Sequence, residues 1–205
     1  MSIFWATQYR PGDLLAAIAG FSEISGVFAQ VGANQARLLV AMTQDVGSAA
    51  VVTNWNSMGD AVAAFDPVDG TAFKLVASSP ALSAQLANYG SPLRRVIGNI
   101  GLSFGDTSAG KYAVNVVQSS SAGPELWAEA AEVAWEALKA QGAIGLQVAR
   151  VLTGDATGLY LGTVLTDDVN QFTTAVSKLP PRLVELFGAT GTSTVLRNVH
   201  RIISQ

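Results

Sequence analysis

Hydrophobic and polar positions in the first half of the chain follow the spacing of strands and helices in turn. Short apolar runs bounded by turn residues predict strands, and apolar residues recurring every three or four positions predict helices. Ser57 and Gly90 have the chemistry of a helix start and a helix stop. The predicted elements are strands at 3–9, 37–43, 49–55 and 93–104, a helix at 13–28, and a second helix at 57–89 interrupted by a loop at 66–70.

The second half of the chain predicts the same order of elements, β-α-β-β-α-β. In its first helix, Leu126, Ala130, Val133, Ala137 and Leu138 predict a buried stripe, and glutamates mark the wet face. The predicted elements are strands at 112–118, 145–152, 158–165 and 195–203 and helices at 124–140 and 166–187, the latter broken at Pro180-Pro181.

An internal repeat relates the two halves. Asp45, after one predicted strand, stands 110 positions before Asp155, and the same offset carries Gln8 onto Gln118. Self-similarity at a fixed offset indicates two copies of one structural unit. The predicted repeats are residues 1–107 and 108–205.

The composition excludes several functional classes. With 49% hydrophobic and only 13% charged residues, the chain has few solvated side chains, so we expect a homo-oligomer that buries further apolar surface. A net charge of -3 with scattered Lys and Arg lacks the basic patch of a nucleic-acid-binding protein. The absence of cysteine and the single histidine exclude a thiolate site and a His-rich metal cluster, and we expect no metal and no cofactor.

Acidic residues interrupt the most apolar regions of the sequence. No run reaches the roughly 18 apolar residues that a membrane-spanning helix needs, so we expect no membrane association. Arg10 and Asp13 precede the first apolar helix, which argues against a secretory signal. We therefore expect a cytoplasmic protein.

The first predicted helix differs in charge from its counterpart in the second half. It carries only Asp13 and Glu23 and has hydrophobic residues nearly all round, which predicts that its outer face is covered. This helix is therefore the candidate subunit interface. On this interpretation, Phe21→Glu or Phe28→Glu would break the assembly.

Two β-α-β-β-α-β units of about 100 residues in one chain resemble the dimeric α+β barrel superfamily. That group includes antibiotic-biosynthesis monooxygenases, haem-degrading monooxygenases, EthD-like proteins and NIPSNAP-like proteins. The resemblance covers nearly the whole chain and implies an α+β fold in which two ferredoxin-like repeats form an intrachain dimeric barrel. It implies a fold rather than a function, because one fold hosts many chemistries.

Polar and aromatic residues within the apolar strands are the candidate ligand-binding set. A buried amide needs hydrogen-bond partners, which are either a ligand or other groups of the protein. Aromatic residues line pockets for flat ligands, and they are equally core residues by default. The candidates are Trp5, Gln8, Asn54, Trp55, Asn115 and Gln118.

Two isolated features invite a catalytic interpretation. Residues 105–111 match the G-x-x-x-x-G-K phosphate loop, but Tyr112 replaces the magnesium-binding Ser or Thr and a strand follows, so we interpret them as a linker. His200 lies in the final strand without the partners of a catalytic base or haem ligand. We therefore expect a structural histidine.

Charged residues near the ends of the halves have two interpretations. Arginines on the two final strands either hold a carboxylate or protect exposed sheet edges, and the second is the commoner use. Asp155 lies in a turn and Asp167 and Asp168 begin a helix, where acidic residues are favoured without a cation. The arginines are Arg94, Arg95, Arg197 and Arg201.

Two functional hypotheses follow. The first is a non-enzymatic binding or oligomeric assembly protein, favoured by the low charge and the lack of acid–base groups. The second is a cofactor-independent monooxygenase or isomerase-like enzyme that acts on a small apolar molecule in a barrel pocket. We expect any site in the first half, whose strands hold more aromatic and amide residues.

Overall fold

A computed structural model describes residues 2–121 and 123–203 of the chain. The fold is mixed α+β. Contacts divide it into two compact units, Met1–Asn99 with Ile202–Gln205 (unit 1) and Ile100–Arg201 (unit 2).

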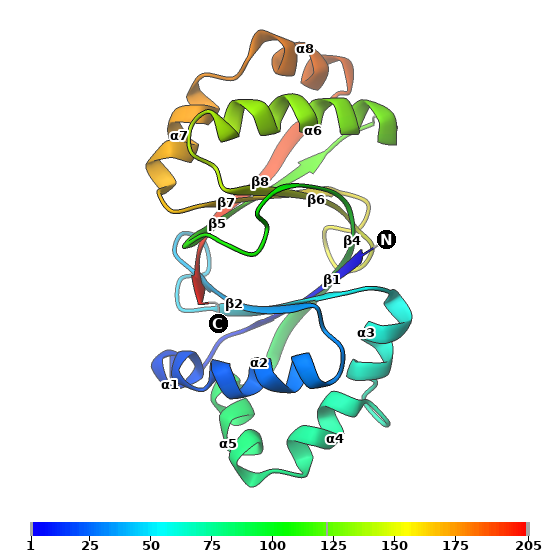
Figure 1. Ribbon diagram of the computed structural model, residues 1–205, viewed down its shortest axis with the longest axis vertical. Coiled ribbons are helices and arrows are strands. Elements are labelled where there is room, and N and C mark those ends of the chain that lie inside the picture. Colours follow the sequence, from blue (N-terminus) through cyan, green and yellow to red (C-terminus); the bar gives the residue numbers. More distant parts are fainter. Residues whose placement is uncertain (1, 122, 204–205) are drawn as a thin grey trace. The chain divides into compact units, whose positions relative to one another are not determined.

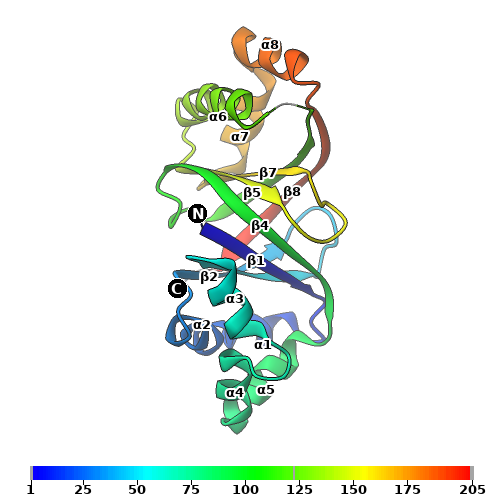
Figure 2. The same ribbon diagram turned by 90° about the vertical axis from the view of Figure 1, so that its right-hand side faces the viewer.

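Unit 1 combines a sheet with a layer of helices. Its central strand β3 (Ala49–Trp55) is antiparallel to both β1 (Ser2–Tyr9) and β2 (Gln35–Ala41). Figures 1 and 2 show the helices on one side of this sheet, so one sheet face is buried beneath them. The helices are α1 (Leu14–Ala19), α2 (Phe21–Gln30), α3 (Met58–Phe65), α4 (Thr71–Ala77) and α5 (Pro80–Tyr89).

The first helix predicted from the sequence is two helices in the structure, α1 and α2, which meet at Gly20. Here α5 approaches so closely that a Cβ on Gly20 would lie 1.9 Å from Oε1 of Gln85. The phenol of Tyr89, at the end of α5, donates a 2.9 Å hydrogen bond to the carbonyl oxygen of Ala17. The contact partner is the end of a flexible side chain, so a larger residue at Gly20 would require Gln85 to move.

The outer surface of α1 and α2 differs from the predicted one. Phe21 is fully buried beside Ile24 and Leu38, and Phe28 packs partly buried against the same core. Among the described large apolar side chains of α1 and α2, Leu15 is the exposed one, with 78% of its surface accessible. Phe21 is thus a core residue, and its substitution would test folding rather than assembly.

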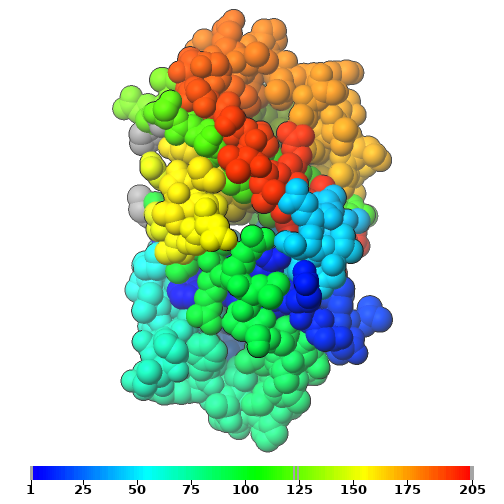
Figure 3. Space-filling model, turned by 180° about the vertical axis from the view of Figure 1, so that it is seen from behind, coloured from blue at the N-terminus to red at the C-terminus, as the bar shows by residue number. Residues whose placement is uncertain are grey.

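Unit 2 also combines a sheet with a helical layer. β7 (Tyr160–Thr166) is antiparallel to both β5 (Tyr112–Ser119) and β6 (Gly145–Val151), and β8 (Ser193–Ile203) pairs with the other edge of β5. Figure 1 shows the helices over one face of this sheet. Figure 3 shows β8, in red, open to the surface beside the orange helical segment. The helices are α6 (Pro124–Lys139), α7 (Val169–Ser177) and α8 (Pro181–Ala189).

The buried stripe of α6 is centred on its tryptophans. Trp127 and Trp135 are buried, whereas Leu126, predicted to be buried, is 41% exposed. Trp127 stacks on Tyr160 with ring centroids 4.2 Å apart, and Trp135 stacks on Phe104 at 6.2 Å. Tryptophan buries more area than leucine, so these two residues set the phase of the helix.

Two strands contribute residues to both units, β4 (Pro92–Gly105) and β8. The hydrogen-bonded order of the strands is β1-β3-β2-β8-β5-β7-β6-β4, that of a closed barrel. The interpretation of the two halves as tandem ferredoxin-like repeats stays a prediction. Within residues 2–121 and 123–203, no helix has both the length and the apolar character needed to cross a membrane.

Candidate functional site

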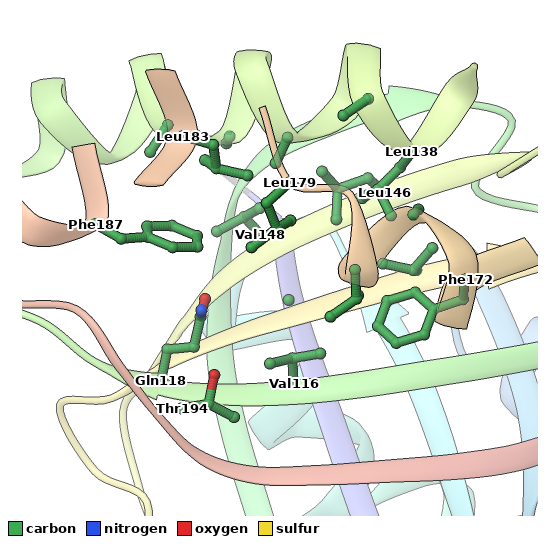
Figure 4. A pocket seen from close by; sticks show the side chains of 18 of the residues that line it. Val116, Gln118, Leu138, Leu146, Val148, Phe172, Leu179, Leu183, Phe187 and Thr194 are labelled. Carbon is green, nitrogen blue, oxygen red and sulfur yellow. The ribbon is translucent and has the colours of Figure 1, made fainter. Parts of the chain in front are cut away.

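A cavity of about 200 Å³ lies in unit 2 between the sheet and the helices, and we call it the unit 2 cavity. Figure 4 shows side chains of β5, β6, α7 and α8 pointing into this space. Most of the wall is aliphatic or aromatic, which is typical of a site for a small molecule. Labelled lining residues are Val116, Gln118, Leu138, Leu146, Val148, Phe172, Leu179, Leu183, Phe187 and Thr194.

The cavity exists because small residues stand where the sheet and α6 face each other. On the sheet, Gly162 pairs with Val116 on one side and Val148 on the other, so a side chain is missing from the middle of the row. A Cβ on Gly162 would lie 3.8 Å from the carbonyl oxygen of Val116, an ordinary contact distance. Opposite, α6 contributes only methyl groups at several lining positions, namely Ala130, Ala131, Ala134 and Ala137.

A β-bulge directs two polar residues of β8 toward the cavity. Val117 pairs with Leu196 and Gln118 pairs with Thr194, so the intervening residue of β8 is extra. An extra residue reverses the alternation of side chains along a strand. Thr194 and Arg197, three positions apart, therefore both line the cavity.

Arg197 is the only charged residue among the described residues that line the unit 2 cavity. Its guanidinium carbon lies 5.6 Å from the centroid of the Phe172 ring, within the range of a cation–π contact. Across the described part of the chain, Arg197 forms no ion pair with a carboxylate. Arg197 and Thr194 are exposed, so the cavity opens to solvent beside β8.

Gln118 supplies an amide to the same space. Figure 4 shows its side chain rising from β5 toward Phe187 of α8, next to Thr194. Its side-chain amide has no hydrogen-bond partner among the described residues. One donor and one acceptor group are therefore left for a ligand.

The corresponding space in unit 1 is a cavity of only about 50 Å³. The ring of Phe65 fills this region, with its centroid 4.7 Å from that of Trp5, 5.6 Å from Phe28 and 5.5 Å from Trp55. Tyr9 also lines the cavity, and burial raises the pKa of its phenol. Of the predicted site residues in this unit, Trp5 lines the small cavity and Trp55 is fully buried core.

Gln8 and Asn54, also predicted as ligand-binding residues, lie on the sheet face away from the unit 1 helices, because each follows a helix-facing neighbour. The amide of Gln8 donates to Oγ of Ser48 at 2.9 Å and accepts from Nε of Arg94. The amide of Asn54 donates to Oε1 of Gln35 at 3.2 Å. Protein groups therefore bind both ends of the Gln8 amide and the N–H donor of the Asn54 amide. The repeat offset of 110 positions relates Gln8 to Gln118, but the two side chains face different sides of their sheets. Gln8 faces away from the helices of unit 1, whereas Gln118 faces the helices of unit 2.

Asn115 lies on the face of the unit 2 sheet opposite the cavity, since its neighbour Val116 lines the cavity. Its Oδ1 accepts a 2.9 Å hydrogen bond from Oγ1 of Thr163, and its Nδ2 lies 3.5 Å from Nδ1 of His200. Burial lowers the pKa of His200, which favours the neutral imidazole. Asn115 and His200 thus belong to a cross-strand polar cluster, and only Gln118 of the predicted residues reaches the unit 2 cavity.

The remaining sequence features have structural surroundings. Tyr112 begins β5 directly after residues 105–111, so no helix presents amides to a phosphate. Asp168 caps α7 by accepting from the backbone N–H of Asn170 at 2.8 Å. Among the described residues, no group of three or more His, Cys, Asp or Glu side chains is placed to hold a metal ion.

The other arginines make different contacts. Arg94 pairs with Asp45 at 3.3 Å, Arg95 lines the small unit 1 cavity, and Arg201 lies over the ring of Tyr112 at 5.1 Å. Of the four arginines singled out in the sequence, only Arg197 enters the unit 2 cavity.

Comparison with known proteins gives similarity in fold. No protein-family model matches the chain, and no curated protein matches its sequence. An anthrone oxidase-like protein is 10% identical over 98% of this chain and 91% of its own, with a TM-score of 0.55. A candidate monooxygenase from Fusobacterium nucleatum is 11% identical over 99% and 93%, with a TM-score of 0.57. A haem-binding protein from Thermus thermophilus is 10% identical over 98% and 90%, with a TM-score of 0.57.

These structures support the expected likeness to monooxygenase-like and haem-binding α+β barrel proteins, and at such identities they establish the fold alone.

The unit 2 cavity does not suit haem. Protein ligands to haem iron are His, Cys, Met or Tyr side chains, and none of these is among the described lining residues. His200, the single histidine of the chain, is on the opposite side of the sheet, where it meets Asn115. The cavity is also smaller than the roughly 300–1,000 Å³ of sites for drug-sized ligands.

Proposed function

We propose that the chain binds a small, flat and mostly apolar molecule in the unit 2 cavity. The observation that carries this proposal is a cavity of about 200 Å³ whose apolar wall holds Gln118, Thr194 and Arg197. Concave apolar sites with a few polar groups are the usual sites of small-molecule binding.

The volume limits the ligand. An apolar protein cavity of about 150 Å³ takes up benzene, so the unit 2 cavity matches one ring with substituents or two small fused rings. Gly162 and the alanines of α6 leave room between the sheet and the helix, and a planar molecule is the shape that fits between two such layers.

Native mass spectrometry of the purified protein tests this proposal, with indole as an added neutral probe. A retained small molecule, or indole binding that perturbs the methyl NMR signals of Val148 and Leu183, supports it. The proposal fails if indole leaves those signals unchanged at millimolar concentration.

A second candidate function is that of a cofactor-independent monooxygenase or isomerase-like enzyme. Arg197 and Gln118 favour it, because N–H donors in an apolar cavity stabilise an oxyanion that develops during reaction. The described lining residues include no carboxylate, His, Lys or Tyr that would act as a base, so the substrate would have to be acidic by itself. Oxygen uptake or isomerisation with one-ring phenols and naphthols tests this candidate, and unchanged substrates would exclude it for those compounds.

For the assembly of the chain, we propose that residues 1–107 and 108–205 are tandem ferredoxin-like repeats, and that the outer face of α1 and α2 joins subunits. Exposed Leu15 and the scarcity of charge on this face support the interface. Light scattering tests this interface by comparing the mass of the Leu15→Glu variant with that of the Val184→Glu variant. Val184 is the control because it is another exposed apolar position. Dissociation of the first variant alone supports the interface, and a monomeric wild-type protein would exclude it.

A further inference from the structure

Arg197 places an unneutralised positive charge at the edge of an otherwise apolar cavity. No Asp or Glu is among the described residues that line the unit 2 cavity, and Arg197 forms no ion pair with a described carboxylate. Arginines in folded proteins commonly hold a planar acid through two parallel hydrogen bonds. The charge is therefore available to a ligand.

One ring contact positions this guanidinium beside the cavity. Arg197 is paired across the strands with Val116, in the same row as Gly162 and Val148. Its side chain reaches α7, where the guanidinium carbon lies 5.6 Å from the centroid of the Phe172 ring. A ring contact of this kind is weak at an exposed site, so it favours this position of the group without fixing it, while its N–H donors need an acceptor from elsewhere.

A second polar position lies farther along the same strands. Gln118 is two residues beyond Val116 and is paired with Thr194, so it faces the cavity about 7 Å along β5 from the row that contains Arg197. The side chain of Val116 and the gap at Gly162 belong to the row of Arg197, and they form the apolar floor beside both polar positions. The cavity thus has a cationic position and a neutral hydrogen-bonding position beside one apolar floor.

From this arrangement we infer that the ligand is a small aromatic carboxylic acid. The carboxylate is held by the guanidinium of Arg197, the ring lies over the apolar floor at Val116 and Gly162, and a neutral hydroxyl or carbonyl group on the ring meets Gln118 and Thr194. This inference rests on the proposed binding of a small flat molecule in the unit 2 cavity and specifies its charge.

The experiment compares 4-hydroxybenzoate with its uncharged isostere, 4-hydroxybenzamide, by NMR titration of the full chain. Hydrogen bonds to charged groups are the stronger class, so we expect the acid to bind about ten- to a hundredfold more tightly than the amide. Arg197→Gln should remove that preference. Arg197→Lys, which keeps the charge but not the two-pronged geometry, should retain part of it.

Arg201→Gln is the matched control. Arg201 is on the same strand, is exposed, and lies over the ring of Tyr112 at 5.1 Å, but it does not line the cavity. This variant should keep the full preference for the acid. Equal affinity of the wild-type protein for acid and amide, or a preference that survives Arg197→Gln, would overturn the inference.

Indole separates failure of this inference from failure of the proposed function. If indole binds in the cavity but the acid binds no better than the amide, the carboxylate inference alone is wrong. If neither indole nor the two benzoyl compounds perturb the methyl signals of Val148 and Leu183, both proposals are wrong.

Discussion

Gly162→Val is the sharpest single test of the unit 2 cavity. Gly162 stands between Val116 and Val148 on the cavity floor, and a Cβ there meets its first neighbour at 3.8 Å. The β and γ carbons of valine would therefore extend into empty space rather than into backbone. The substitution should stabilise the ligand-free protein and block the site.

The expected gain in the free energy of unfolding combines several terms. Replacing a strand glycine contributes about 0.5–1 kcal/mol. Burying the isopropyl group contributes about 1.5–3 kcal/mol if burial is complete. Fixing the side chain and imperfect packing oppose these gains by about 1 kcal/mol. A net gain of about 1–3 kcal/mol is expected, which raises the melting temperature by about 2–12 °C for a chain of this size.

Urea denaturation and indole titration measure the two consequences in one preparation. Gly101→Val is the control, because Gly101 is also a strand glycine with a first neighbour at 3.9 Å but does not line the cavity. We expect indole affinity to fall at least tenfold in the Gly162 variant and to stay unchanged in the control. A Gly162 variant that loses stability, or that binds indole as well as the wild-type protein, would refute the argument.

Further predictions concern stability. Tyr89→Phe removes a buried 2.9 Å hydrogen bond to the carbonyl of Ala17 and should lower the free energy of unfolding by about 0.5–1.5 kcal/mol in urea denaturation; no loss would mean that the bond adds nothing. Ser57→Ala removes the N-cap of α3, whose hydroxyl accepts from the backbone N–H of Asp60 at 3.1 Å, and should cost about 1 kcal/mol, whereas Ser57→Thr should cost less. Because burial lowers the pKa of His200 in the folded protein, the unfolded chain takes up a proton first on acidification, so stability should fall as the pH drops below about 6.5. His200→Gln should flatten that decline in denaturation curves measured between pH 7 and 5, and an identical decline would assign it to other groups.

The periodicity of the chain predicts its elements because the information is local. The strand at 49–55 has the predicted bounds, and Ser57 caps the following helix as its side-chain chemistry indicates. The division at Gly20 was not predictable in the same way, because apolar residues keep their helical spacing across it, from Ile18 to Phe21 and Ile24. In α6, Leu126 fits the helical period, but the larger Trp127 competes for the buried side.

The candidate site was predictable only in part. Gln118 was identified as an amide within an apolar strand, and it does line the larger cavity. Arg197 was noted among four strand arginines, but nothing in its neighbours distinguishes it from Arg201. The cavity itself arises from the absence of a side chain at Gly162, and a missing group gives no periodic signal. The larger cavity lies in unit 2, whereas we expected any site in the first half, whose strands hold more aromatic and amide residues. In unit 1, the ring of Phe65 fills the space beside Trp5.

The bulge in β8 makes the length of the chain part of the recognition chemistry. Deleting Val195, which is 58% exposed, would leave every other side chain in the protein unchanged. Thr194 would then stand two positions before Arg197, and regular alternation would keep both side chains on the cavity face. A loss of one codon here would thus leave both polar side chains facing the ligand, whereas a loss of two codons would turn Thr194 to the opposite sheet face. The number of residues deleted from this strand, rather than deletion itself, therefore decides which molecules the cavity accepts.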